Sequence, residues 1–180
     1  LGYGMYRDHA EAVKWYNKAA DNGSGLAMFS IANCYFEGDG VEQDRDLARK
    51  WYEKSAQAGC RDAMFALGVI HHRGFGVKED MALALDWYNR SAEAGCIKAM
   101  LKLADLHKNG QGVDKDINRW YNWNFEAAKA GSYEGMYRMG TAFENGLGVE
   151  ENDRTADMWY EKAVRFGSEK AKEQIKIAKN

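Results

Sequence analysis

A tryptophan recurs every 36 residues along the whole of this 180-residue chain, at Trp15, Trp51, Trp87, Trp123 and Trp159. Two sets of glycines, one of methionines and one of valines keep the same spacing, and no insertion or deletion interrupts them. A fixed period of 20–50 residues marks a repeat protein, in which each repeat is one supersecondary element. Neighbouring repeats stack to bury a continuous core. The period therefore predicts an array of 36-residue repeats. We call residues at the same place in successive repeats a column.

Residues 60–95 show what one repeat contains. Apolar and small residues recur at spacings of three and four over about 62–73, which predicts a first helix with one buried face. Gly68 lies in a column of small residues, which lets another helix approach closely. A turn at 74-GFG-76 follows, and a second helix begins near Asp80, a residue type that favours the helix N-cap. The second helix is expected to end at Gly95 in a left-handed conformation.

Two columns of the second helix support this reading. The column of Asp80 holds a residue that caps helices in every repeat, at Asp8, Asp44, Asp116 and Asn152. The buried face of the second helix is predicted to carry Ala84, Trp87, Tyr88 and Ala92. Each repeat is thus a helix, a glycine turn, a second helix and a shorter glycine turn.

The repeated columns resemble those of the SEL-one-like repeat, a relative of the tetratricopeptide repeat. The matching pattern is 27-AMFSIANCYFEGDGVEQDRDLARKWYEKSAQAG-59, and it recurs in 99-AMLKLADLHKNGQGVDKDINRWYNWNFEAAKAG-131. The resemblance covers essentially the whole chain. It implies an all-α fold, a right-handed α-solenoid of stacked antiparallel helix pairs with about ten helices.

This phase predicts one solenoid domain over residues 1–180. Its expected parts are an N-terminal half repeat (1–23), four full repeats (24–59, 60–95, 96–131 and 132–167) and a C-terminal capping helix (168–180). The chain begins in the middle of a repeat, which suggests a cut through a longer array. The last helix places Lys172 and Lys176 in columns that are elsewhere methionine and small, and a polar outer face of that kind suggests a natural end.

The second helix of the repeat 96–131 departs from the pattern. Trp120 stands where the other repeats have alanine, and Asn124 stands where they have tyrosine. A tryptophan does not fit a space shaped for alanine without repacking. We therefore expect a changed helix angle or a partly exposed Trp120. For the aromatic stretch 119-RWYNWNF-125, a structural role is favoured over a binding role.

The stretch 71-HHRGFGV-77 raises the question of a metal or phosphate site. His71 and His107 share a column with Tyr35 and Phe143, so we expect both to pack in the core. Neighbouring helix residues point about 100° apart, which prevents His71 and His72 from sharing a metal easily. The glycine turns occur in every repeat, lack the extended phosphate-binding motif and have acidic neighbours. We therefore predict no metal and no cofactor.

Other classes of function find little support. The formal net charge is −2, with no basic cluster and no apolar run long enough to cross a bilayer, so neither nucleic-acid binding nor membrane insertion is expected. Cys60 and Cys96 share a column, and equivalent atoms of adjacent repeats are expected to lie about 8–10 Å apart. This distance is too long for a disulfide. Unpaired thiols lean towards the cytoplasm, but the location stays open. No S-x-x-K or G-x-S-x-G motif is present, so we expect no enzyme activity.

In tetratricopeptide-like stacks the first helix of each repeat lines a concave groove, and the resemblance implies the same here. Three columns are then available to a partner. One is apolar, and it serves either as the floor of a peptide site or as packing between adjacent helices. The other two vary in chemistry. The candidate residues are Phe29, Asn33, Phe36, Phe65, Val69, His72, Arg73, Leu101, Asp105, Lys108, Tyr137, Thr141 and Glu144, with Phe36, Phe65, His72 and Arg73 as expected anchors.

The function that the resemblance implies is a non-catalytic scaffold or adaptor that binds a protein or peptide. Two alternatives stay open. One is a small-molecule binder or hydrolase, as attributed to some cysteine-rich relatives, although their paired cysteines are missing here. The other is a regulatory segment of a longer chain. The sequence does not predict an oligomeric state.

Overall fold

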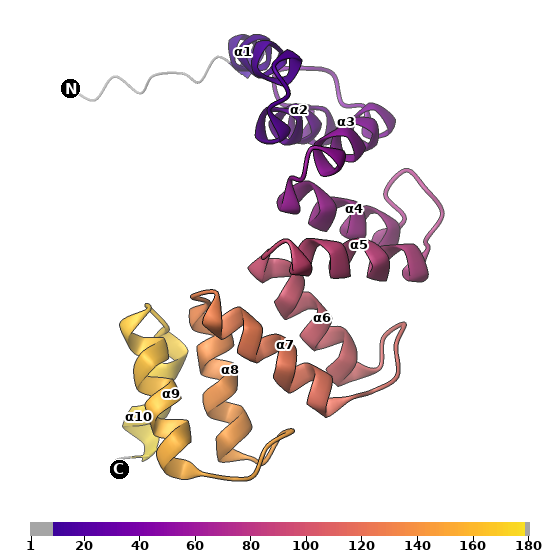
Figure 1. Ribbon diagram of the computed structural model, residues 1–180. Coiled ribbons are helices and arrows are strands. Elements are labelled where there is room, and N and C mark those ends of the chain that lie inside the picture. The colour runs from indigo at the N-terminus through magenta and orange to yellow at the C-terminus, as the bar shows by residue number, and fades with distance from the viewer. Residues whose placement is uncertain (1–8, 179–180) are drawn as a thin grey trace, which may run out of the picture. The chain divides into compact units, whose positions relative to one another are not determined.

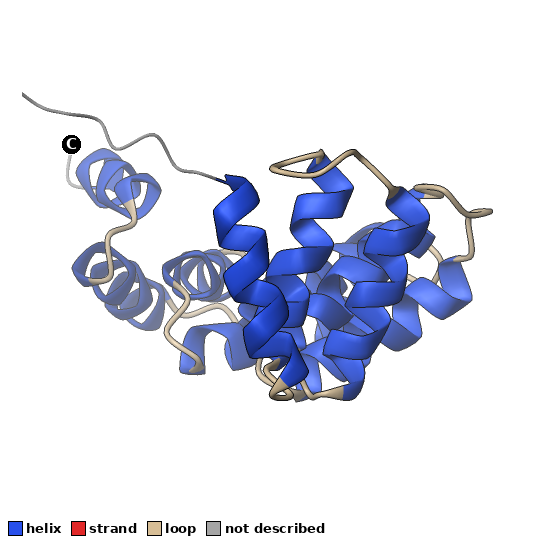
Figure 2. Cartoon of the chain, turned by 90° about the horizontal axis from the view of Figure 1, so that it is seen from above, coloured by secondary structure: helices blue, strands red, loops and turns tan. Residues whose placement is uncertain are grey.

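The computed structural model describes the chain from residue 9 to residue 178, and within that range it contains ten helices and no strand (Figures 1 and 2). The helices are α1 (His9–Asp21), α2 (Gly25–Glu37), α3 (Arg45–Gln57), α4 (Arg61–Arg73), α5 (Met81–Glu93), α6 (Ile97–Asn109), α7 (Ile117–Lys129), α8 (Tyr133–Glu144), α9 (Asp153–Arg165) and α10 (Glu169–Ala178). The all-α prediction is confirmed.

The helices pack as the repeat pattern predicts. Each first helix packs on the second helix of its own repeat, so α2 pairs with α3, α4 with α5, α6 with α7 and α8 with α9. In Figure 1, α4 and α5 lie side by side over their whole length. The chain divides into two compact units, an N-terminal unit up to Ala94 and a C-terminal unit from Gly95. Each is described by itself below, and the assignment of the chain to one solenoid domain stays a prediction.

The second helices begin where the cap residues predicted them. The side chains of Asp44, Asp80 and Asn152 each accept a hydrogen bond from a backbone N–H three residues later, at 2.8–2.9 Å. Asp116 accepts two, from the N–H groups of Asn118 and Arg119. These bonds satisfy donors that the first helical turn leaves open. The four predicted caps are confirmed, and the fifth, Asp8, lies outside the described residues.

The glycine turns also follow the prediction. Gly74 ends α4 with a φ of 65°, and Gly95 follows α5 with a φ of 85°. A positive φ of this size crowds the Cβ atom of any other residue, so glycine is the residue that fits. The repeated glycines are therefore explained by backbone geometry.

The first helices differ in their N-caps. Ser24, Ser132 and Ser168 accept hydrogen bonds from backbone N–H groups, at 3.3, 3.0 and 3.2 Å. Cys60 and Cys96 occupy the same column but make no side-chain cap bond. α4 and α6 therefore start without the bond that serine provides in the other repeats.

Replacing Cys60 by serine is therefore expected to stabilise the protein. A new bond to a free backbone N–H should raise the free energy of unfolding by about 0.5–1 kcal/mol. Urea unfolding followed by circular dichroism would measure the gain. The reverse change, Ser132→Cys, should cost a similar amount. Equal stability of wild type and Cys60→Ser would contradict the role given to this column.

The cores of the repeats 60–95 and 132–167 depend on a small residue beneath a tyrosine ring. A Cβ atom added to Gly68 would lie 2.5 Å from the Tyr88 ring, and one added to Gly140 would lie 2.4 Å from the Tyr160 ring. Both tyrosines are almost fully buried, at 1% and 3% exposed. The expectation that a small residue allows close approach of a second helix is confirmed.

The expectation of a partly exposed Trp120 is wrong. Its side chain is 2% exposed and packs against Ala104 and Ala142. The physical reason is a compensating change one helical turn later, where Asn124 replaces the usual tyrosine. Lys108 lies over the Trp120 ring at 5.3 Å, whereas His72, in the same column, contacts the Tyr88 ring. We infer that Trp120 fills the volume that tyrosine takes in the other repeats.

Two further expectations about the core need correction. His107 is buried as predicted, but His71 is half-buried. His71 lies at the edge of the core, where burial lowers its pKa while the charges of Asp80, Arg49 and Glu53 act on the ring.

Trp87, expected on the buried face, is also half-buried, and Trp15 is 61% exposed. A cation three residues further along the helix lies over such rings, with Arg90 4.2 Å from the centre of Trp87 and Lys18 4.5 Å from that of Trp15. Lys54 and Lys162 lie over Trp51 and Trp159 in the same way, so four of the five tryptophans in the column carry a cation over the ring.

Candidate partner-binding surface

The thirteen residues predicted to bind a partner all reach the surface. None is buried: Arg73 and Lys108 are exposed, and the other eleven are half-buried. They lie on α2 and α4 in the N-terminal unit and on α6 and α8 in the C-terminal unit. Their role in binding stays a prediction, but their neighbours can be described.

On α2, three of these residues surround the buried tyrosine of the same repeat. The rings of Phe29 and Phe36 lie 5.7 and 6.4 Å from the ring of Tyr52. The Tyr52 hydroxyl donates a hydrogen bond of 2.6 Å to the Oδ1 atom of Asn33. Burial, with a smaller contribution from Glu37, raises the pKa of Tyr52. Each of the three side chains therefore contacts the core on one side and reaches the surface on the other.

Phe36 also connects α2 to the next repeat. Its ring lies 5.8 Å from that of Phe75, the middle residue of the following glycine turn. The guanidinium of Arg45 lies over both rings, at 5.7 and 5.5 Å. Phe36, an expected anchor, thus belongs to a cation–aromatic cluster that partly encloses it.

On α4 the same arrangement recurs with different side chains. Phe65 lies 5.6 Å from Tyr88, and the Nδ1 atom of His72 lies 3.4 Å from the Tyr88 hydroxyl. Burial raises the pKa of Tyr88 to about 12, against the opposing charge of Arg73. Arg73 is exposed at the end of the helix, and Val69, on the same helix, is half-buried.

In the C-terminal unit an ion-pair network occupies part of the predicted surface. The Nη1 atom of Arg138 lies 2.7 Å from Asp105, and its Nε atom lies 3.0 Å from Glu134. Burial disfavours the charge of Arg138, but its hydrogen bonds to Asp105 and Glu134 raise its pKa overall. Asp105, on α6, is thus held by α8. Sequence reasoning missed Arg138, because its column (Ser30, Ala66, Lys102) lies outside the three that were considered.

On α8, the predicted residues meet a third buried tyrosine. Tyr137 lies 5.6 Å from the ring of Tyr160, whose hydroxyl donates a 2.6 Å hydrogen bond to Glu144. The other oxygen of Glu144 accepts a hydrogen bond from Gln174 of α10 at 2.9 Å. Three members of the apolar column therefore pack on the tyrosine of their own repeat, while Leu101 lies in the repeat where Trp120 replaces it. Packing on these tyrosines therefore explains why three of the four residues in that column are apolar.

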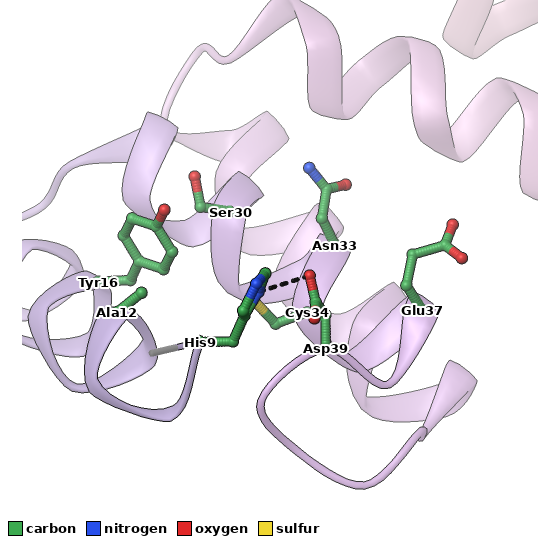
Figure 3. A pocket seen from close by; sticks show the side chains of 8 residues that line it. All are labelled: His9, Ala12, Tyr16, Ser30, Asn33, Cys34, Glu37 and Asp39. Carbon is green, nitrogen blue, oxygen red and sulfur yellow. Dashed lines mark ion pairs between the residues drawn. The ribbon is translucent and has the colours of Figure 1, made fainter. Parts of the chain in front are cut away.

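A hollow between α1 and α2 was not singled out from the sequence (Figure 3). It has a volume of about 500 Å³, and the Nδ1 atom of His9 lies 2.7 Å from Asp39 at its edge. Its lining residues are His9, Ala12, Tyr16, Ser30, Asn33, Cys34, Glu37 and Asp39. The sequence carries no signal for it, because Tyr16 shares a column with three buried tyrosines and its half-burial is seen only in the structure.

Other kinds of site find no support in the described part of the chain. Within it, no group of three or more histidine, cysteine, aspartate or glutamate side chains is placed to hold a metal ion. None of the helices described is long and apolar enough to cross a membrane. The three cysteines are buried, and burial, together with the charge of Asp39, raises the pKa of Cys34.

These features define the class as an all-α repeat protein built from helix pairs. The model of the Sel1 repeat matches residues 1–24, 25–60, 61–96, 97–132 and 134–165. The chain therefore belongs to the Sel1 repeat family. Proteins of this family generally mediate protein–protein interactions on a fold that is typically non-catalytic. No curated protein sequence matches the chain.

Solved structures agree with this assignment. A Sel1 repeat protein from Oxalobacter formigenes is 34% identical, with a TM-score of 0.84 over 93% of this chain and 69% of its own. A protective antigen of uropathogenic Escherichia coli with an SLR fold is 28% identical, with a TM-score of 0.83 over 94% of this chain and 36% of its own. An immunity protein from Pseudomonas aeruginosa is 25% identical, with a TM-score of 0.62 over 93% and 62%.

Proposed function

We propose that the chain is a non-catalytic scaffold that binds a protein or peptide on the exposed parts of its first helices. One observation carries the proposal. Phe36, His72, Lys108 and Glu144 occupy one column, and each contacts the buried ring of its own repeat. These four contacts are alike in position, yet the side chains are aromatic, imidazole, cationic and anionic.

The core columns of alanine and tyrosine depart from their pattern in one repeat, whereas this surface column differs in all four, which favours recognition over structure as the reason for the variation. Packing needs alone would select similar side chains at equivalent places, as the core columns of alanine and tyrosine show. A binding surface instead needs different side chains at different points along the partner. Aromatic residues and arginine contribute most to such surfaces, which supports Phe36 and Arg73 as anchors.

The proposal that no catalysis occurs rests on the state of the groups that might act as nucleophiles. Burial raises the pKa of Cys34, and the charge of Asp39 raises it further. Burial also raises the pKa of Tyr160, and its hydrogen bond to Glu144 adds to the effect. Activation of a nucleophile requires the opposite, a lowered pKa or a neighbouring base. Both groups stay protonated near neutral pH, which supports binding without chemistry.

Selection of ligands from a displayed random-peptide library would test the proposal. Arg73→Glu in the N-terminal unit and Lys108→Glu in the C-terminal unit each reverse a charge on the proposed surface. At least one of the two variants should bind the selected ligands with a Kd that is about tenfold higher or more, measured by titration calorimetry.

The matched control is Lys50→Glu, which makes the same charge change at an exposed position on the second helix α3. It should leave Kd unchanged. Ligands that bind all three variants as tightly as the wild type would place binding elsewhere and overturn the proposal.

A further inference from the structure

Arg45, the first residue of α3, lies over two aromatic rings at once. Its guanidinium is 5.7 Å from the centre of the Phe36 ring and 5.5 Å from that of the Phe75 ring. Phe36 belongs to the last turn of α2, and Phe75 lies in the turn that follows α4. Three segments of the N-terminal unit therefore meet at this side chain. We call Phe36, Arg45 and Phe75 the arginine–aromatic cluster.

The equivalent place one repeat earlier holds an ion pair. His9 stands in the column of Arg45, and Asp39 stands in the column of Phe75. The Nδ1 atom of His9 lies 2.7 Å from the Asp39 carboxylate. Arg45 thus occupies a position where the preceding repeat sets a basic side chain against an acid, but a phenylalanine ring takes the place of that acid.

The guanidinium of Arg45 has no acidic partner among the described residues. Arg45 is exposed, and its guanidinium forms neither an ion pair nor a hydrogen bond with any part of residues 9–178. Other arginines of the same unit are paired: Arg49 lies 2.6 Å from Glu53, and Arg90 lies 3.8 Å from Asp86. The two rings therefore hold a planar fork of N–H donors that no described carboxylate uses.

We propose that the arginine–aromatic cluster binds an acidic side chain of the peptide or protein that the first helices recognise. The inference rests on the proposed function, because Phe36 belongs both to the cluster and to the surface proposed there. A guanidinium binds a carboxylate through parallel N–H···O bonds, and a ring beneath it orients the group without using its donors. The partner therefore carries an aspartate or glutamate at the point that reaches the C-terminal end of α2.

The charges beside the cluster favour a carboxylate over a phosphate. Asp44 and Asp46 flank Arg45 in the sequence, and Glu37 follows Phe36. Their negative charge repels a doubly charged phosphate more strongly than a singly charged carboxylate. The same charges limit the gain from one carboxylate, so its expected contribution to Kd is about tenfold.

Parallel selections from one displayed random-peptide library, on the wild-type chain and on Arg45→Met, test the inference. Methionine keeps an unbranched side chain over the two rings but removes the charge and the donors. Peptides selected by the wild type should share an aspartate or glutamate at one position, and peptides selected by Arg45→Met should not. A shared acidic position in both selections, or in neither, would contradict the inference.

The tightest wild-type peptide then locates the contact. Replacing its shared acid by the corresponding amide should raise Kd about tenfold on the wild-type chain. The same replacement should leave Kd unchanged on Arg45→Met, because the arginine that the acid contacts is gone. Titration calorimetry gives the four values of Kd. Equal losses on both chains would mean that the acid binds elsewhere, and the inference would be wrong.

Arg90→Met is the matched control. It makes the same change at an exposed arginine that also lies over an aromatic ring of the N-terminal unit, but on the second helix α5. It should bind the acidic peptide as tightly as the wild type does. If Arg45→Met does not fold, Arg45→Lys replaces it: lysine keeps the charge but loses the planar fork, so the acidic peptide should bind severalfold more weakly.

Two further results separate this inference from its alternatives. A peptide with phosphoserine in place of the shared acid should bind no more tightly than the acidic peptide, and tighter binding would overturn the choice of a carboxylate. Selected peptides that are weakened by Arg73→Glu or Lys108→Glu but share no acid would overturn the inference and leave the proposed function standing. Selection of no peptide by the wild-type chain would overturn both.

Discussion

Trp120→Ala is expected to lower the free energy of unfolding by about 3–5 kcal/mol, as large aromatic truncations in tight cores do. Trp120 is among the largest fully buried side chains described, and it fills the space between Ala104 and Ala142. Alanine is the residue that the other repeats carry in this column. The loss therefore comes from the missing tyrosine one turn later, because Asn124 leaves the cavity empty.

The double variant Trp120→Ala/Asn124→Tyr restores the pattern of the other repeats and should recover most of that loss. Asn124→Tyr alone should cost about 1–3 kcal/mol, since the new ring competes with Trp120 for one space. The change also removes the buried Asn124 Oδ1 atom, which has no hydrogen-bond partner. The two positions should therefore be coupled by at least about 2 kcal/mol.

Urea unfolding of the four proteins would give this coupling energy. Trp87→Ala is a suitable control, because Trp87 is half-buried and packs against a different core cluster, so its loss should be smaller and independent of Asn124→Tyr. Additive effects of Trp120→Ala and Asn124→Tyr would show that the two side chains do not share one cavity.

The parts of the fold that depend on local geometry could be predicted from the sequence. Asp80 marks the start of α5 because its carboxylate reaches a backbone N–H three residues later, whatever the rest of the chain does. Gly74 marks the end of α4 because its positive φ excludes other residues. Repetition strengthens both signals, since the same residue types recur at the same positions of each repeat.

The parts that depend on contacts between distant residues could not be predicted in the same way. Trp120 is too large for its own column taken alone, and its burial follows only from the compensating change at Asn124, one helical turn later. Arg138 was missed because its partner Asp105 is 33 residues away on another helix. A search for paired departures from the repeat pattern would have found the first of these.

The candidate surface lies between these two cases. Its assignment to partner binding stays a prediction, but none of its thirteen residues is buried, because the helix period indicates which side chains are left over from the core. Their neighbours were not foreseen. Phe29 and Phe65 contact tyrosine rings as well as the surface, so their substitution would disturb folding and binding together. Exposed Arg73 is therefore the cleaner position for testing the proposed function.

Alkaline solution is expected to destabilise the protein through its buried tyrosines. Burial raises the pKa of Tyr88 from an ordinary 10.0 to about 12. Above pH 10 the Tyr88 hydroxyl loses its proton in the unfolded chain but keeps it in the folded chain. The contribution of Tyr88 to the free energy of unfolding is therefore fully present below pH 10 and is lost as the pH rises towards 12. The difference between the folded and the unfolded pKa of Tyr88 corresponds to about 3 kcal/mol of stability. Burial also raises the pKa of Tyr52 and of Tyr160, which adds to the loss.

Urea unfolding at a series of pH values would measure this loss, with Tyr88→Phe as the informative variant. Between pH 10 and 11 the free energy of unfolding of Tyr88→Phe should fall by about 1 kcal/mol less than that of the wild type, because one ionising group is gone. Tyr133→Phe removes a hydroxyl from a ring that is 51% exposed and should leave the slope unchanged. Parallel curves for wild type and Tyr88→Phe would mean that the Tyr88 hydroxyl ionises as easily in the folded protein as in the unfolded chain, contrary to its burial beneath α4.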